Sequence, residues 1–221
     1  MKRSIVALLV ILGIFALACG FLDSDIATVT YEDSFPVRFS IDADQVCPPD
    51  IDCSATPAEA NEERELLDIE FGVDVDIIEA LERAAEEGEV QVKDPRSLTE
   101  RMRSIEVTSI DYETDDNTLT FDVPDLAIHV GPTGSRKADD DGTVHLTTID
   151  SIPALETASG NAPVREDASE PSSELFQGLQ FAAIPAATPT VKEGQPFPPS
   201  GKTDMTLIFN IKLEANPLDS L

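Results

Sequence analysis

Met205-Thr-Leu-Ile-Phe-Asn-Ile-Lys-Leu213 carries an apolar side chain at every second position. Side chains of an extended strand point alternately to its two faces, so the five odd-numbered residues of this stretch share one face. The pattern predicts a long strand with one face buried against a core. It is the clearest strand pattern in the chain, and it needs other strands beside it to complete a sheet.

Shorter alternating stretches predict these other strands. In residues 105–112 the apolar parity changes halfway, which predicts a β-bulge near Thr108. The prolines of residues 181–191 predict an edge strand, because proline cannot donate a hydrogen bond to a neighbouring strand. Asp33-Ser34 is predicted to form a turn between two strands. The predicted strands are 26–31, 35–41, 67–75, 105–112, 126–130, 144–149 and 181–191, with 119–123 either a strand of its own or joined to 126–130 by a kink at Pro124.

Helical spacing is clear in one stretch, residues 77–87, where Asp76 can cap the start and Gly88 can end the helix. Shorter helices are predicted near 98–103, after a capping-box pattern, and around 175–179. Long polar segments, at 47–65, 131–142, 156–173 and 192–202, predict loops. Together these elements predict a mainly β protein, an antiparallel β-sandwich with one or two short helices, folded as a single β-rich domain of residues 26–221.

The charge of the chain excludes some functions. It has 43 Asp and Glu against 15 Lys and Arg, a formal net charge of −28. Nucleic-acid binding is excluded because phosphate recognition needs clustered cations. The motifs Gly-x-Ser-x-Gly and His-Glu-x-x-His and the glycine-rich phosphate loops are absent from the sequence, so we expect a protein that is not an enzyme. The sequence alone gives no biochemical activity.

The N-terminus has the features of a signal peptide. Lys2 and Arg3 are followed by the apolar stretch 5–17, which is too short by itself for a stable membrane-spanning helix. This stretch ends at Ala16-Leu17-Ala18, directly before Cys19. Residues 1–18 are therefore predicted to be a cleaved signal peptide that leaves Cys19 first. An ordinary secretory signal and an uncleaved anchor helix of residues 5–22 are the alternatives.

Ala16-Leu17-Ala18-Cys19 resembles the lipobox of bacterial lipoproteins, with Ala16 where the usual pattern prefers leucine. The resemblance covers residues 1–19 only. It implies that Cys19 carries a diacylglyceryl group and that residues 19–25 tether the domain to the membrane, with acyl chains such as palmitate as the anchor. Because Gly20 follows the cysteine, the same resemblance implies the outer rather than the inner membrane of the cell envelope.

The other two cysteines, Cys47 and Cys53, enclose Pro-Pro-Asp-Ile-Asp. In an oxidising envelope they are predicted to form a structural disulfide that closes a short loop. Free thiols are the alternative. A metal site would need two more ligands at suitable spacing, and a redox pair normally has two intervening residues rather than five.

A calcium ion is the most specific ligand that the sequence suggests, and otherwise no cofactor is expected. Asp139 and Asp141 alternate before Gly142, as in part of a calcium loop, although the distal glutamate of an EF-hand is missing. The alternative is a solvated acidic surface. His129 and His145 are each predicted to point away from the core, because each lies between apolar residues of the opposite parity.

Four cations, Lys93, Arg96, Arg101 and Arg103, lie within eleven residues of an otherwise acidic chain. They either pair with the protein's own carboxylates or contact a partner or an anionic lipid headgroup. Together, the sequence predicts a lipid-anchored, acidic bacterial envelope protein that acts as a structural or interaction module with a protein partner still to be identified. A calcium-dependent binding module on the cell surface is the second hypothesis.

Overall fold

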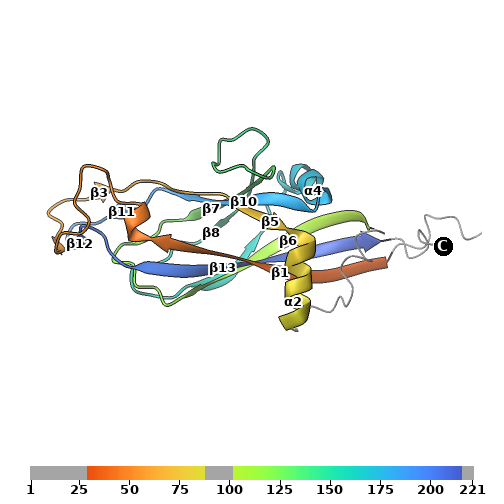
Figure 1. The fold of residues 1–221 in the computed structure, drawn as a ribbon, viewed down its shortest axis with the longest axis horizontal. Coiled ribbons are helices and arrows are strands. Elements are labelled where there is room, and N and C mark those ends of the chain that lie inside the picture. The colour runs from red at the N-terminus through yellow and green to blue at the C-terminus, as the bar shows by residue number, and fades with distance from the viewer. Residues whose placement is uncertain (1–28, 88–101, 216–221) are drawn as a thin grey trace, which may run out of the picture.

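The computed structural model describes residues 29–87 and 102–215, which form two antiparallel β-sheets packed as a sandwich (Figure 1). The predicted signal peptide 1–18, Cys19 and the tether 19–25 lie outside the described residues. So do Lys93, Arg96 and Arg101 of the cationic run. Within the part that is described, no helix is long and apolar enough to cross a membrane.

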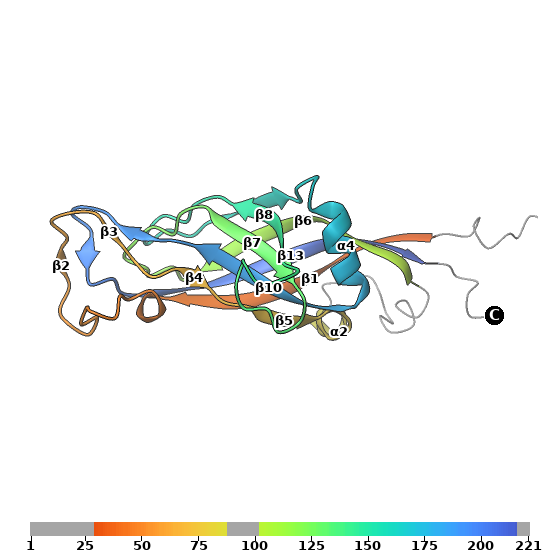
Figure 2. The ribbon, with the colours of Figure 1, turned by 90° about the horizontal axis from the view of Figure 1, so that it is seen from above.

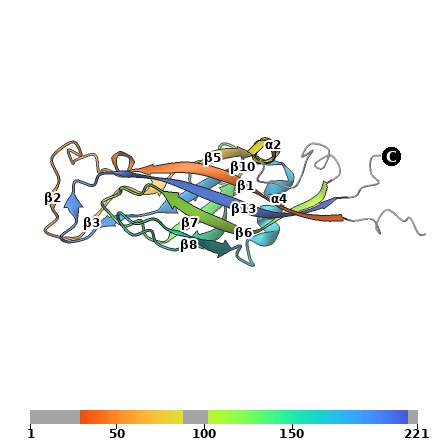
Figure 3. The ribbon, with the colours of Figure 1, turned by 90° about the horizontal axis from the view of Figure 1, so that it is seen from below.

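The first sheet has the strand order β1-β13-β6-β9, of which Figure 3 labels the first three strands. Its strands are β1 (Val29–Asp42), β13 (Lys202–Ala215), β6 (Met102–Asp115) and β9 (Ser159–Pro163). The alternation that predicted β13 is confirmed, since Met205, Leu207, Phe209, Ile211 and Leu213 are all buried. The turn predicted at Asp33-Ser34 is wrong. Both residues continue β1, because an unbroken ladder with β13 outweighs their local preference for a turn.

The predicted bulge near Thr108 is confirmed. Asn210 of β13 faces Ser109 of β6, but the next residue, Ile211, faces Val107, so Thr108 has no partner in the ladder. This extra residue lets both halves of β6 bury their apolar side chains.

The second sheet joins β8 (Val144–Ile149), β7 (Leu126–Gly131) and β10 (Gln180–Ala187), and β10 also pairs with two short strands, β4 (Ile69–Glu70) and β5 (Val73–Asp76). The prediction of an edge strand at 181–191 is therefore wrong, because β10 has neighbours on both sides. Its proline is tolerated because β5 stops pairing at Ala183 and β4 begins at Ala186. Pro185 lies at the break between them, where that side of the ladder needs no hydrogen bond.

Aromatic rings join the two sheets. Phe35 of β1 stacks on Phe209 of β13, with 5.4 Å between ring centroids, and Phe181 of β10 lies 5.6 Å from Phe209. Phe176 packs edge-on against Phe181 at 4.9 Å. All four rings are fully buried, so they form the centre of the core between the layers.

In the described part of the chain, two α-helices flank the sandwich. The predicted helix at 77–87 is confirmed as α2 (Ile77–Glu87), which packs against β1 and β5. The helical turn predicted around 175–179 begins earlier, as α4 (Ser169–Gln177), and supplies Phe176 to the core. The predicted helix at 98–103 is wrong at Met102 and Arg103, which belong to β6, and its other residues lie outside the described part.

Residues 119–123 do not form the predicted strand. Leu119, Phe121 and Val123 are buried, which explains the alternation, but the segment forms isolated bridges, from Asp122 to Thr190 and from Val123 to Ile152, instead of a ladder. Thr120 adds hydrogen bonds to Ser200. The segment connects β6 to β7 and adds three side chains to the core.

The sandwich is elongated, with both ends of the described chain at one extremity, which we call the base (Figures 1 and 2). Val29 pairs with Ala215 at the base, and Asp42 pairs with Lys202 at the other end of the same ladder. Beyond Asp42 lies the distal tip, which we define as residues 43–68 and 188–201. It contains the 3₁₀ helix η2 (Ala43–Gln45) and the short strands β2 (Ala58–Glu59), β3 (Arg64–Glu65), β11 (Thr190–Val191) and β12 (Pro196–Phe197).

Candidate functional site

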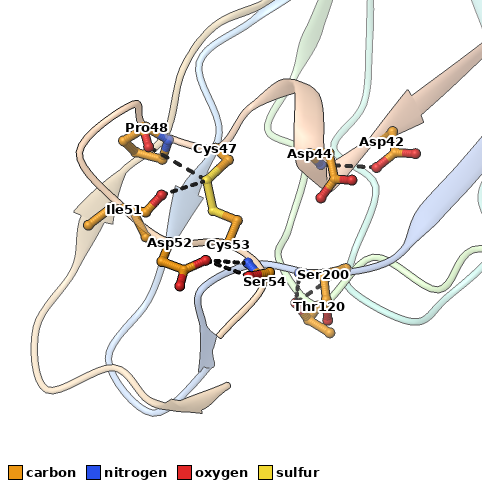
Figure 4. The surroundings of a disulfide bond; sticks show 10 residues. All are labelled: Asp42, Asp44, Cys47, Pro48, Ile51, Asp52, Cys53, Ser54, Thr120 and Ser200. Atoms are coloured by element: carbon orange, nitrogen blue, oxygen red, sulfur yellow. Dashed lines mark hydrogen bonds between the residues drawn. A yellow bond between two sulfur atoms is a disulfide. The ribbon is translucent and has the colours of Figure 1, made fainter. Parts of the chain in front are cut away.

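A disulfide closes the distal tip (Figure 4). Cys47 and Cys53 are bonded, with 6.4 Å between their Cα atoms, which confirms the predicted pairing. After the disulfide, the Ser54 hydroxyl and backbone N–H both donate to the Asp52 carboxylate, at 2.6 and 3.1 Å. These bonds lower the pKa of Asp52. The loop is thus fixed both covalently and by its own polar groups.

The two segments of the distal tip are hydrogen-bonded to each other. β3 pairs with β11 and β2 pairs with β12. Ala60 N–H donates to Gln195 O and Gly194 N–H donates to Ala60 O, each at 2.9 Å. The Arg64 guanidinium lies 5.0 Å from the Phe197 ring centroid, a cation–π contact across the same two segments. The sequence predicted a surface loop at 47–65, and the structure adds order to that loop through residues far away in the sequence.

The distal tip is strongly acidic. It contains nine carboxylate side chains and two cations, Arg64 and Lys192. Both cations are already paired within the molecule, Arg64 with Glu62 at 3.1 Å and Lys192 with Asp122. The carboxylates are exposed at Asp44, Asp50, Asp52, Glu59, Glu62, Glu63, Glu65, Asp68 and Glu193.

A second ordered feature is the connection between β7 and β8, residues 132–143, which we call the cover loop. The Arg136 guanidinium donates two hydrogen bonds to the Asp74 carboxylate, at 2.6 and 3.1 Å, and Gly134 N–H donates to the same carboxylate at 2.8 Å. These bonds lower the pKa of Asp74 to about 2. Further along, Ala138 N–H donates to Glu70 Oε1 at 2.8 Å. Carboxylates of β4 and β5 therefore hold the cover loop in place.

The cover loop crosses the outer face of β10, the face turned away from the core (Figure 2). Gly72 and Gly131 flank β10 on its two sides, and Ser135 lies against both. A Cβ atom on Gly72 would be 2.0 Å from Ser135 O, and one on Gly131 would be 3.0 Å from Ser135 Oγ. The loop therefore needs glycine at position 72, where the contact is with backbone, and packs closely against Gly131 through side chains. Ile184 of β10 is completely buried although it is not part of the central core, as expected for a residue beneath this loop.

The structure places the two predicted calcium ligands in the cover loop but brings no third ligand to them. Asp139 and Asp141 are exposed. It is Asp140 that orders the loop, because its carboxylate accepts the N–H groups of Arg136 and Lys137 at 2.7 and 3.0 Å, which lowers its pKa. Within residues 29–87 and 102–215, no group of three or more His, Cys, Asp or Glu side chains is placed to hold a metal ion.

The two histidines, treated separately in the sequence, are neighbours in the fold. His129 of β7 faces His145 of β8, and their rings stack with 4.8 Å between centroids. Both are on the outer face, as predicted, but His129 is half-buried there. Burial first, and then the nearby His145, lowers the pKa of His129. The sequence did not predict this contact because it depends on the strand register, which brings together residues 16 positions apart at a bulge in β8.

Cavities also open on the surface of the described part of the chain. One, of about 260 Å³, lies between β1, β5 and α2, and three of its charged side chains, Asp74, Asp76 and Arg83, are bonded to Arg136, Gln180 and Glu79, respectively. Another, of about 420 Å³, lies beside Asp122 and Lys192, which pair with each other. This pairing lowers the pKa of Asp122. The charged groups named here thus have partners within the protein.

Comparisons with known proteins give distant structural likenesses alone. No family model and no curated protein matches the chain. Similar solved structures include the decameric BFDV capsid protein, at 9% identity and TM-score 0.35, covering 84% of this chain and 98% of that one. Desmodium yellow mottle tymovirus matches at 11% identity and TM-score 0.28, covering 86% and 91%. Scores this low carry no conclusion about this protein, whose fold class rests on its own sheets.

Proposed function

We propose that the protein is a lipid-anchored, non-enzymatic component of the bacterial cell envelope that presents its distal tip to a partner. The observation that carries the proposal is the placement of the ends. Val29, the first described residue, lies at the base, and the disulfide-closed tip lies at the opposite extremity. An anchor at Cys19 would hold the base near the lipid and leave the tip facing away from it.

The maximum reach of the predicted tether and the length of β1 support this orientation. From Cys19 to Val29 the chain can reach at most roughly 35 Å when fully extended. The fourteen residues of β1 then run about 45 Å from the base towards the tip. The tip would therefore be held at a distance from the membrane by a rigid sheet rather than by a flexible stalk.

The build of the distal tip suits a contact surface. Its disulfide and its paired short strands hold exposed side chains in fixed positions, which lowers the entropy cost of binding. Its surplus of exposed carboxylates favours a partner that carries cations and disfavours acidic ones. By resemblance to lipoprotein sorting, Gly20 favours the outer membrane as the place where this contact is made.

The anchor is tested by the intact mass of the protein purified from its native membrane. We expect the mass of the chain from Cys19 onward plus acyl chains, and 2 Da less than for free thiols at Cys47 and Cys53. A Cys19→Ala variant should lack the acyl chains and leave the membrane fraction. An unmodified mass or a retained residue 1 in the natural protein would contradict the proposal.

The contact surface is tested by photo-crosslinking in intact cells. A photoreactive amino acid at Asn61, exposed in the distal tip, should capture a partner of defined mass, whereas the same probe at Gln177, exposed at the end of α4, should not. Replacing both Cys47 and Cys53 with serine should weaken capture from position 61. Equal capture from both positions, or from neither, would count against the tip as the contact surface.

A further inference from the structure

One ring nitrogen of His129 is buried without a hydrogen-bond partner. Among buried side-chain nitrogen and oxygen atoms of the described residues, His129 Nδ1 alone lacks a hydrogen bond. His129 faces Ile184 of β10 in the ladder. On the other side of β10, Glu70 of β4 faces Ala186, two positions further along, so Glu70 and His129 lie on the same outer face of the sheet. That same Glu70 carboxylate holds the cover loop through Ala138 N–H.

The neighbouring His145 does not serve as a hydrogen-bond partner for His129 Nδ1, because its own ring nitrogens have other partners. Arg165 Nη1 lies 3.0 Å from His145 Nδ1, and a guanidinium can only donate, so Nδ1 accepts. His145 Nε2 then carries the hydrogen, which it donates to Thr147 O at 2.9 Å, with Thr148 Oγ1 at 3.0 Å. This assignment follows from the partners rather than from observed hydrogens. Both ring nitrogens of His145 thus have partners other than His129.

The charges around His129 are unequal on its two sides. From β8 and the segment after β9 come His145 and Arg165, the latter bound to Asp167 at 2.8 Å. From β4 comes Glu70, and β10 contributes the uncharged Ile184. In the cover loop, Arg136 is bound to Asp74, while Arg136 and Lys137 both donate their backbone N–H to Asp140. A proton added to His129 therefore has Glu70 as its attractive carboxylate.

We propose that His129 and Glu70 form an acid-operated release for the middle of the cover loop. When His129 is neutral, the Glu70 carboxylate accepts the Ala138 N–H and holds the loop against the sheet. When His129 takes up a proton from solvent, the Glu70 carboxylate moves towards the imidazolium and gives up Ala138. No covalent bond changes, and deprotonation of His129 restores the closed loop.

The pH range of the release follows from the surroundings of His129. Burial, His145 and Arg165 lower its pKa below the ordinary 6.5, and Glu70 acts in the opposite direction. The loop should therefore respond below pH 6.5. Its other attachment should not respond there, because the pKa of Asp74, which accepts Gly134 N–H, is about 2. Gly134 is thus an internal control within the same loop.

Nuclear magnetic resonance of the full chain in detergent, between pH 7.5 and 5.5, tests the release. We expect the Ala138 amide shift to change with the same midpoint as the His129 ring, while the Gly134 amide shift stays constant. Hydrogen exchange at Ala138, corrected for the intrinsic effect of pH, should become faster at the acid end. An Ala138 amide that does not follow His129, or a Gly134 amide that moves with it, would overturn the proposal without any variant.

Two variants distinguish the release of the cover loop from a general loss of stability in acid. Glu70→Gln keeps an oxygen that can accept the Ala138 N–H but removes the charge, so His129 should still titrate while Ala138 no longer responds. His129→Gln should abolish the response of Ala138 altogether. A response of Ala138 that persists in either variant would overturn the proposal, and the wild-type comparison above decides the matter if a variant does not fold.

Discussion

At the scale of single residues, Asp74 is the group whose ionisation matters most clearly. Arg136 and the Gly134 N–H bind its carboxylate and lower its pKa from 3.8 to about 2. A carboxyl group whose pKa is lower in the folded protein than in the unfolded chain stabilises the fold at pH values above its unfolded pKa. That contribution is lost as the pH falls from about 4 through about 2.

We therefore expect Asp74→Asn to destabilise the protein at pH 7 by at most about 1 kcal/mol, since an ion pair this exposed is screened by solvent. The difference from the natural protein should narrow as the pH falls below 4. Urea denaturation across this range measures it. The matched control is Asp141→Asn, which removes an exposed carboxylate from the cover loop that Asp74 holds. An equal loss in the control would show that the effect is one of net charge and not of the Arg136 contact.

At the scale of elements, the sequence predicts what depends on neighbours along the chain. The parity of β13 and the parity shift that requires a bulge at Thr108 are both local patterns. The helix at 77–87 and the loop-closing disulfide between Cys47 and Cys53 are local as well. Each of these predictions is confirmed, because burial of one face and closure of a short loop both depend on residues that are close together in the sequence.

What the sequence could not predict depends on contacts between distant segments. Pro185 suggested an edge strand because nothing near it shows that β4 and β5 leave a break at that register. The close approach of Ser135 to Gly72, and the stacking of His129 on His145, are set by which strands pair. Cross-strand register is a property of the whole sheet, so the candidate site at the cover loop was outside the reach of local patterns.

The packing of β13 supports a matched pair of predictions on one strand. Phe209 is fully buried against Phe35 and Phe181, whereas its neighbour Ile208 points to the outer face and is half-buried. We expect Phe209→Ala to cost about 3–5 kcal/mol of unfolding free energy and Ile208→Ala about 1 kcal/mol. Urea denaturation of both variants measures this, and similar losses would mean that the two faces of β13 are not distinguished as described.

At the scale of the whole molecule, the net charge of −28 implies self-repulsion that salt should relieve. We expect the melting temperature to rise with NaCl and to rise equally with CaCl₂ at matched ionic strength, because the described residues bring no third ligand to Asp139 and Asp141. Thermal unfolding in both salts measures this. A saturable extra rise with calcium, lost in Asp141→Asn, would instead favour the calcium-dependent binding module.

The elongated shape makes the proposed anchoring testable as an orientation. With Cys19 acylated, the base should lie within about 35 Å of the lipid and the distal tip about 45 Å further away. On vesicles that contain brominated lipids, a fluorescent amino acid at Thr30, exposed at the base, should be quenched more strongly than one at Asn61 in the tip. The Cys19→Ala variant should lose quenching at both positions, since it no longer binds the vesicles. Stronger quenching at Asn61 than at Thr30 would mean that the tip, and not the base, faces the membrane, and the contact surface would then have to be sought at the other end of the molecule.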